Sequence, residues 1–208
     1  MARINQGILG PFSGKVGEVI GSSWKGIPYI KSRTMSFHDP KTPAQLAHRM
    51  KLQVAHGFVR SVKGFIEIGY RELSENQTPY NKAVSFILRN AVVGEYPAIG
   101  IDPSKVMVSQ GKLAGAENCL FSMEEDGKLN FSWDENIPNE GTQADDCALL
   151  LVYNFTKQQA ISAQSCRSER KGTAKIPDNW KGDKMAVYIF FASIESDAVS
   201  NSQYLGMV

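Results

Sequence analysis

The sequence predicts an α+β protein in which an N-terminal β-hairpin and a helical hairpin precede an antiparallel β-sandwich. Three observations carry this prediction. The chain opens with glycine-rich, alternating segments around Lys25-Gly26. A pattern of helical period follows Thr42-Pro43, and after Pro97 the apolar residues alternate as they do in strands. A chain of 208 residues can hold one large domain or two small ones, and we expect a division into residues 1–100 and 101–208.

The predicted hairpin joins a strand over Val16–Trp24 to a strand over Ile27–Lys31 through a two-residue turn. Residues Met1–Ser13 contain glycine and proline and are expected to form an arm or an edge segment. Trp24 and Tyr29 flank the turn and can form a cross-strand aromatic pair. Because a two-stranded hairpin is marginal alone, we expect it to pack on the helix that follows.

Two helices are expected next. Thr42 can cap the first, Pro43 fits its first position and Gln45 completes a capping box. Apolar residues then recur at spacings of three and four and predict one buried stripe. They are Leu46, Met50, Val54, Phe58, Val62 and Phe65. A second helix is expected from Thr78-Pro79 through Asn90, joined to the first by the polar segment Ser74–Gln77.

The C-terminal half reads as short, regularly spaced strands, which favours an antiparallel sandwich. The candidates are Val106–Ser109, Cys119–Met123, Leu129–Trp133, Ala148–Asn154, Ile161–Cys166, Thr173–Ile176, Met185–Ala192 and Val199–Leu205. Asp126-Gly127 is a hairpin turn signal between the second and third of these. Leu129, Phe131 and Trp133 are expected to face inward. Leu149, Leu151 and Tyr153 are expected to do the same.

This half resembles a fibronectin type III or immunoglobulin-like domain in the rhythm of its strands. Trp133 lies near the end of an early strand, and Tyr153-Asn154 ends the next one, as in that pattern.

Charge is distributed unevenly along the chain. Residues 1–65 hold ten Lys or Arg against Glu18 and Asp39, a net charge of +8, whereas the remainder carries −6. A basic half beside an acidic half indicates a nucleic-acid surface or head-to-tail contact between copies of the chain. Solvated faces of two different domains explain the asymmetry equally well.

No catalytic constellation is recognisable, so we expect a protein that is not an enzyme and that holds no cofactor. Gly10–Val16 looks like a phosphate-binding loop, but its glycine spacing is one residue short, and Val16 stands where Ser or Thr would hold magnesium. The three histidines do not share a spacing that suits one metal ion.

Cys119, Cys147 and Cys166 lack the paired spacing of a zinc site. Two of them can pair if their strands are neighbours, but buried free thiols are the preferred interpretation. No apolar run reaches the length of a membrane span. We see no secretory signal, which favours cytoplasmic synthesis and leaves open a later release in a particle.

The basic opening is the one feature that indicates a function. Its candidate contacts to a partner or to nucleic acid are Lys15, Trp24, Lys25, Tyr29, Lys31, Arg33 and Arg49. Cations interleaved with aromatic rings suit nucleic-acid backbone contacts and base stacking. A hairpin packed on the helices, or one that contacts a neighbouring subunit, explains the rings equally well. The favoured hypothesis is a non-enzymatic structural or assembly protein, a self-assembling subunit of a phage-related particle or another polymer. Its partners would be copies of itself or other structural proteins. The alternative is a nucleic-acid-binding module that uses the basic hairpin and helix.

The same opening carries a family resemblance. The residues concerned are Gly14-Lys15-Val16-Gly17, Gly21-Ser22-Ser23-Trp24-Lys25-Gly26, Tyr29-Ile30-Lys31-Ser32, Asp39-Pro40-Lys41-Thr42-Pro43-Ala44-Gln45 and Arg49. They resemble a domain-of-unknown-function family of about this length that is widespread in Bacteroidetes, and the likeness extends to Tyr153-Asn154 and Val199–Gly206. The segment Pro40–Gln45 is also similar to one in small proteins encoded near phage structural genes. The resemblance implies that the hairpin and capped helix are the family's signature, with a β-sandwich behind them, and it implies no activity.

Overall fold

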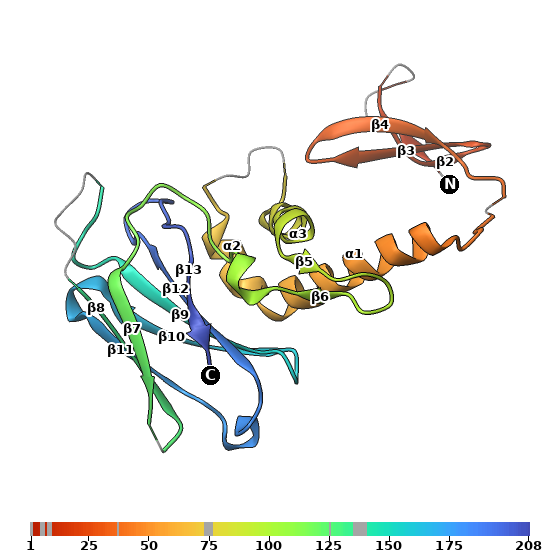
Figure 1. Ribbon diagram of the computed structural model, residues 1–208. Coiled ribbons are helices and arrows are strands. Elements are labelled where there is room, and N and C mark those ends of the chain that lie inside the picture. Colours follow the sequence, from red (N-terminus) through yellow and green to blue (C-terminus); the bar gives the residue numbers. More distant parts are fainter. Residues whose placement is uncertain are drawn as a thin grey trace. The chain divides into compact units, whose positions relative to one another are not determined.

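The chain forms two compact units, residues Met1–Thr42 and Pro43–Val208, in the computed structural model shown in Figure 1. The described residues are 2–4, 7, 10–36, 38–72, 77–124, 126–134 and 141–208. The secondary structure is of the α+β class, as the sequence predicted: strands come first, then three helices, then antiparallel sheets.

The N-terminal unit is a four-stranded antiparallel sheet in the order β1-β2-β3-β4. Its strands are β1 (Arg3–Ile4), β2 (Phe12–Val16), β3 (Val19–Trp24) and β4 (Ile27–Ser32). The turn at Lys25-Gly26 is confirmed. The long strand expected over Val16–Trp24 is wrong at its start, because Gly17, at φ +56°, turns the chain between β2 and β3. The sheet is therefore larger than the predicted hairpin.

Three helices open the second unit: α1 (Pro43–Ser61), α2 (Lys63–Gly69) and α3 (Pro79–Asn90). Both proline-marked helix starts are confirmed. The Thr78 hydroxyl caps α3 by accepting a hydrogen bond from the Asn81 backbone N–H at 3.2 Å. Of the predicted stripe, Phe58 and Val62 are buried in the core and Phe65 packs against it, and Ala55, Val59 and Ile66 are buried beside them. Most of the connection Ser74–Gln77 lies outside the described residues.

Seven strands form the sandwich that follows. They are β7 (Glu117–Met123), β8 (Lys128–Asp134), β9 (Cys147–Asn154), β10 (Gln159–Cys166), β11 (Lys171–Lys175), β12 (Met185–Ala192) and β13 (Gln203–Met207). Between the helices and β7 lie a two-strand pair, β5 (Val92–Val93) with β6 (Gly100–Ile101), and the short 3₁₀ helix η1 (Pro103–Lys105). Two further 3₁₀ helices, η2 (Arg167–Glu169) and η3 (Asp178–Trp180), precede and follow β11.

Two of the expected strands differ. Val106–Ser109 is not a strand, because its polar groups bond elsewhere: the Val108 N–H donates to the Ser202 hydroxyl at 2.9 Å. The last strand begins at Gln203, because Val199 and Ser200 form only isolated bridges to Ala192 and Leu113.

The sandwich has immunoglobulin-like topology. One sheet has the order β11-β8-β7 and the other the order β10-β9-β12-β13. In chain order, β7, β8 and β11 are the first, second and fifth strands of the sandwich and form one sheet. The third, fourth, sixth and seventh strands (β9, β10, β12 and β13) form the other. This Greek-key exchange of strands between two sheets is the arrangement that the strand rhythm indicated.

The helices of the second unit cover the outer face of the sheet β10-β9-β12-β13. The second unit therefore has three layers and two cores. The core between the sheets contains Leu129, Phe131 and Trp133, as predicted. The other core lies between the helices and alternate residues of β9 and β12, among them Phe58 and Tyr153 with ring centroids 4.5 Å apart. Because β9 and β12 are buried on both faces, they are almost entirely apolar.

The inward orientation expected for Leu149, Leu151 and Tyr153 needs a correction. These side chains contact the helical core, and Leu150 and Val152 contact the core between the sheets. The division at residue 100 also differs from the contacts, because α1 and α3 share their core with the sandwich strands and the compact units meet at Thr42 and Pro43.

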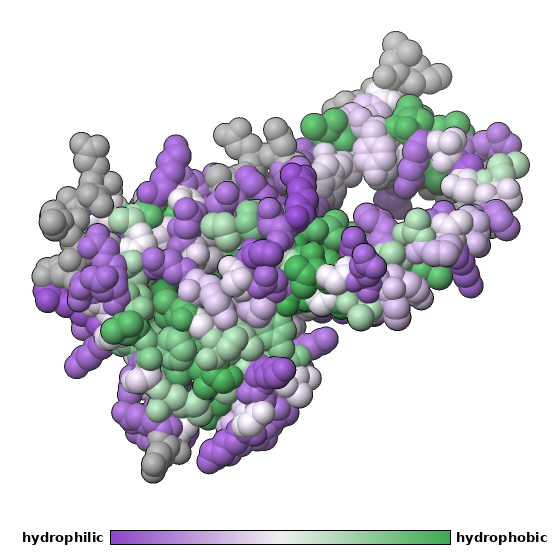
Figure 2. All heavy atoms as spheres, in the orientation of Figure 1, coloured by the Kyte–Doolittle hydropathy of each residue, from purple (hydrophilic) through white to green (hydrophobic). Residues whose placement is uncertain are grey.

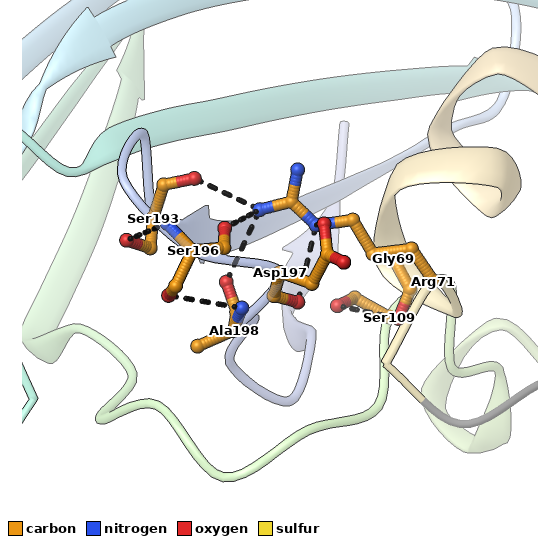
Figure 3. Close-up of polar contacts among 7 residues, drawn as sticks. All are labelled: Gly69, Arg71, Ser109, Ser193, Ser196, Asp197 and Ala198. Carbon is orange, nitrogen blue, oxygen red and sulfur yellow. Dashed lines mark hydrogen bonds and ion pairs between the residues drawn. The ribbon is translucent and has the colours of Figure 1, made fainter.

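Arg71 ties the end of the helical layer to the loop between β12 and β13 (Figure 3). Its Nη2 donates to the carbonyl oxygens of Ser193 and Ser196, both at 2.8 Å, and its Nε donates to the Asp197 carbonyl at 3.1 Å. The Ser109 hydroxyl joins the same region, because it lies within hydrogen-bond distance of the carbonyls of Gly69 and Ser200. One guanidinium thus satisfies backbone acceptors that no secondary structure reaches.

A buried ion pair lies at one end of the sandwich. Arg167 Nε donates to Asp146 Oδ2 at 3.1 Å, and the two residues are 8% and 0% exposed. The guanidinium also donates to the Ala114 carbonyl and lies 3.8 Å above the centre of the Phe191 ring. Burial lowers the pKa of Arg167, and the neighbouring Asp146 opposes that shift.

Two of the three cysteines lie directly opposite each other. All three are free, and Cys147 of β9 pairs in register with Cys166 of β10. Residues opposite each other in an antiparallel pair have Cα atoms about 4.5–5.5 Å apart, within the range that a disulfide spans. Burial, and then the proximity of Cys166, raises the pKa of the Cys147 thiol. The exposed Cys166 is therefore the thiol that an oxidant reaches first.

We expect excess diamide to oxidise these two thiols to a disulfide within one chain. Mass spectrometry of non-reduced peptides should show the segments containing Cys147 and Cys166 linked, with a loss of about 2 Da. Cys119, whose pKa burial raises to about 11, should stay unmodified longest. The variant Cys166→Ser should give no internal link. A link from Cys119 to either residue would contradict the register of β9 and β10.

Candidate interaction site

The N-terminal sheet presents two faces of different chemistry. Because strand residues alternate, the register assigns each side chain to one face. The basic face consists of Arg3, Ser13, Lys15, Ile20, Ser22, Trp24, Ile27, Tyr29 and Lys31. The neutral face consists of Ile4, Phe12, Gly14, Val16, Val19, Gly21, Ser23, Pro28, Ile30 and Ser32.

Tight turns with positive φ fix this register. Lys25 and Gly26 have φ +48° and +81°, as both central residues of a type I′ turn require. The pairs Trp24 with Ile27 and Ser22 with Tyr29 follow from that turn. Trp24 and Tyr29 therefore lie diagonally across β3 and β4 on one face rather than directly opposite each other. With Ile27 they line an open apolar depression.

Gly21 has a specific role on the neutral face. A Cβ at this position would lie 2.1 Å from the Phe12 carbonyl oxygen and 2.7 Å from its ring. Glycine is therefore the residue that lets the Phe12 ring cover β3. Gly21 is also the one buried residue in the described part of this unit.

The structure brings four of the seven expected contact residues together. Lys15, Trp24, Tyr29 and Lys31 share the basic face, and Lys15 and Lys31 lie in one row on either side of Ile20. The other three lie apart from this face. They are Lys25 in the turn, Arg33 after β4, where its N–H donates to the Glu18 carbonyl at 2.7 Å, and Arg49 on α1 in the other unit.

The sequence prediction omitted Arg3 and the whole neutral face. Arg3 lies on a two-residue strand, which is too short to show a period. Large apolar side chains of both faces are exposed. They include Val16, Val19, Trp24, Ile27, Tyr29 and Ile30. Figure 2 shows hydrophobic residues at the surface of this sheet.

The sandwich carries opposite charge. Nine acidic residues and only one basic residue, Lys128, lie between Leu113 and Thr156. Glu117 and Asp134 are directly paired across β7 and β8 at one end of the sandwich. The Gln143 side chain donates to Glu195 Oε2 at 2.6 Å, which brings a further carboxylate to the same end. We call this group the acidic end: Glu117, Asp134, Asp145, Glu195 and Asp197, all exposed.

Other candidate sites are less developed. No three His, Cys, Asp or Glu residues in the described ranges are grouped as a metal site would need. A hollow beside α1 is lined by Met50, Val54, Phe58 and Tyr153, with Arg60 among its polar residues. His56 Nδ1 lies 2.9 Å from the Tyr80 hydroxyl, so this ring nitrogen already has a hydrogen-bond partner. None of the helices in the described residues combines the length and hydropathy needed to cross a membrane.

A comparison with protein families assigns the chain to one family. The model of the family of unknown function DUF6266 matches residues 11–206. The match covers the N-terminal sheet from β2 onward, the helices and the sandwich, so the chain belongs to this family. A search of curated proteins finds no match.

Proposed function

We propose that this protein is a non-enzymatic assembly protein whose N-terminal sheet is its contact module. The observation that supports this most directly is the exposure of large apolar side chains on both faces of a 42-residue unit. Units of this size bury too little surface for stability and usually need disulfides, metals or association. This unit contains no cysteine and one histidine, and we infer that contact with another chain stabilises it.

The charge pattern supports copies of the same chain as the partner. The basic face carries Arg3, Lys15 and Lys31 without a carboxylate, and the acidic end carries five exposed carboxylates. These are different patches on one chain, so their contact is heterologous. Heterologous contacts close into rings or continue as filaments. A subunit of a phage-related particle or another polymer fits this geometry. We further propose that the family is widespread in Bacteroidetes and that residues Gly14–Arg49 are its signature.

The test is the mass of the purified protein by light scattering across salt, with electron microscopy of the same samples. Association at low salt that is lost as salt rises supports charge-driven contact. The reason is that salt screens the interaction between exposed charges, with a Debye length of about 10 Å at 0.1 M. Rings, tubes or fibres would identify the assembly. A monomer at high concentration and low salt would contradict the proposal.

We expect the double variant Lys15→Glu/Lys31→Glu to lose the low-salt association, because two charges on the basic face change sign and its net charge falls by four units. An apparent Kd weakened about 100-fold or more at 50 mM salt is the expected size of the effect. The matched control is Lys175→Glu/Lys184→Glu, which makes the same change at exposed residues of the opposite sandwich end. Equal loss in both variants would show that net charge, not this face, drives association.

One observation favours nucleic acid as an alternative partner: Trp24 and Tyr29 stand among the cations of the basic face, as in platforms that stack bases. This module would bind a single-stranded oligonucleotide with a steep salt dependence. Binding should then weaken in Lys25→Ala/Lys31→Ala/Arg33→Ala. Oligonucleotide binding that this triple variant leaves unchanged would contradict the alternative.

A further inference from the structure

The neutral face of the N-terminal sheet carries no charged side chain. Its large members are Ile4, Phe12, Val16, Val19, Pro28 and Ile30, and its other members are glycines and serines. Ile30 is 67% exposed and Val16 is 55% exposed. A sheet face of this composition is normally covered, because one face of an antiparallel sheet usually packs on a core.

We propose that the occupant of the neutral face is the same face of a second copy, so that two N-terminal sheets pack back to back. An isologous contact places each residue near its counterpart across a two-fold axis, and a face without charge meets no repulsion there. The basic face cannot pair with itself in this way, since Arg3, Lys15 and Lys31 would oppose their own copies. The neutral face therefore suits contact with a second copy of itself, and the basic face suits an anionic partner.

The area of the neutral face sets the expected affinity of the dimer. The four strands have 2, 5, 6 and 6 residues. At about 3.3 Å per residue and about 4.8 Å between strands, they give a flat area of roughly 300 Å². A standard interface buries about 800 Å² per partner, so a dimer made by this face alone should be weak, with a Kd in the micromolar range. Back-to-back packing would leave all three cations of each copy pointing outward.

This inference extends the proposed function, in that the paired sheets would present two basic faces to the acidic ends of further copies. It does not depend on charge, and this separates the two tests. At 0.5 M salt the contact of basic face and acidic end is screened, whereas apolar packing persists. A salt-resistant dimer therefore reports apolar packing, and variants on the two faces identify the face that supplies it.

The experiment is sedimentation equilibrium of the full chain at 0.5 M salt, from about 5 to 500 µM. The unmodified protein should dimerise, and Ile30→Lys should weaken the dimer about 100-fold, because it places two ammonium groups in an apolar contact. The matched control is Ile27→Lys, which adds the same charge to the same strand at a residue 69% exposed on the basic face. The control should dimerise as the unmodified protein does. Equal loss in both variants, or a parent that stays monomeric, would overturn the inference.

A second measurement does not depend on how a buried lysine affects folding. Ser23 and Ser22 are neighbours on opposite faces, so Ser23→Cys and Ser22→Cys differ in little but direction. A short bis-maleimide should cross-link Ser23→Cys into dimers at 0.5 M salt and leave Ser22→Cys at the background that the exposed Cys166 sets in the parent. Cross-linking of Ser22→Cys alone would place the contact on the other face. A lack of cross-linking in both would point to the chain's own helices as the cover.

Discussion

Replacing Arg167 with methionine is expected to lower the free energy of unfolding by about 3–5 kcal/mol. The substitution leaves the carboxylate of Asp146 buried, without the Nε–H that it accepts at 3.1 Å. It also removes the hydrogen bond to the Ala114 carbonyl and the packing of the guanidinium on Phe191. Urea unfolding followed by tryptophan fluorescence gives the value, since the Trp133 indole donates to the Arg167 carbonyl and reports this region.

The control for this prediction breaks an exposed pair instead. Lys63→Met removes an ion pair with Glu67 in which both side chains are more than half exposed, and it should cost no more than a few tenths of a kcal/mol. The double variant Arg167→Met/Asp146→Leu should recover part of the loss, because no charge stays buried. A loss below about 1 kcal/mol for Arg167→Met would mean that water solvates Asp146 in the variant.

Arg71→Met is expected to cost about 2–4 kcal/mol. It withdraws one charged donor from the carbonyl oxygens of Ser193, Ser196 and Asp197, and a hydrogen bond to a charged group contributes about 1.5–3 kcal/mol. The three acceptors share one guanidinium, so their contributions do not add fully. Chemical denaturation measures the effect.

Lysine should not restore what Arg71→Met loses. The three carbonyls surround a planar fork, and an ammonium group on a flexible stem cannot reach all of them at once. Arg89→Met, at an exposed position near the end of α3, is the control and should stay within about 0.5 kcal/mol of the parent. If Arg71→Lys proved as stable as the parent, position 71 would need only a positive charge.

The fold was predictable where local chemistry dictates it. Proline after a threonine marks the start of α3, and Lys25-Gly26 marks a turn whose two residues both take positive φ. The strict alternation of Leu129, Phe131 and Trp133 identified a strand with one buried face. β9 shows no alternation, because helices cover its second face, and single-sequence periodicity cannot tell which parity meets which layer.

The candidate site was predictable only in part. The cations and rings were visible in the sequence, but their grouping depends on the register, which the turn at Gly17 sets. With one long strand over Val16–Trp24, Lys15 falls outside the hairpin. With the turn in place, Lys15 joins Lys31 in one row. The neutral face was missed for the same reason, since β1 and β2 supply Ile4 and Phe12.

The helical layer over β9 and β12 has a consequence for biosynthesis. Phe58 and Tyr153 are in contact, yet about 95 residues separate them along the chain. At ribosomal rates of about 5–20 residues per second, roughly 5–20 s separate the synthesis of Phe58 from that of Tyr153. β12, which ends at Ala192, comes later still. The helices are therefore made well before the sheet that they cover, and the unit can close only after β12 has been synthesised.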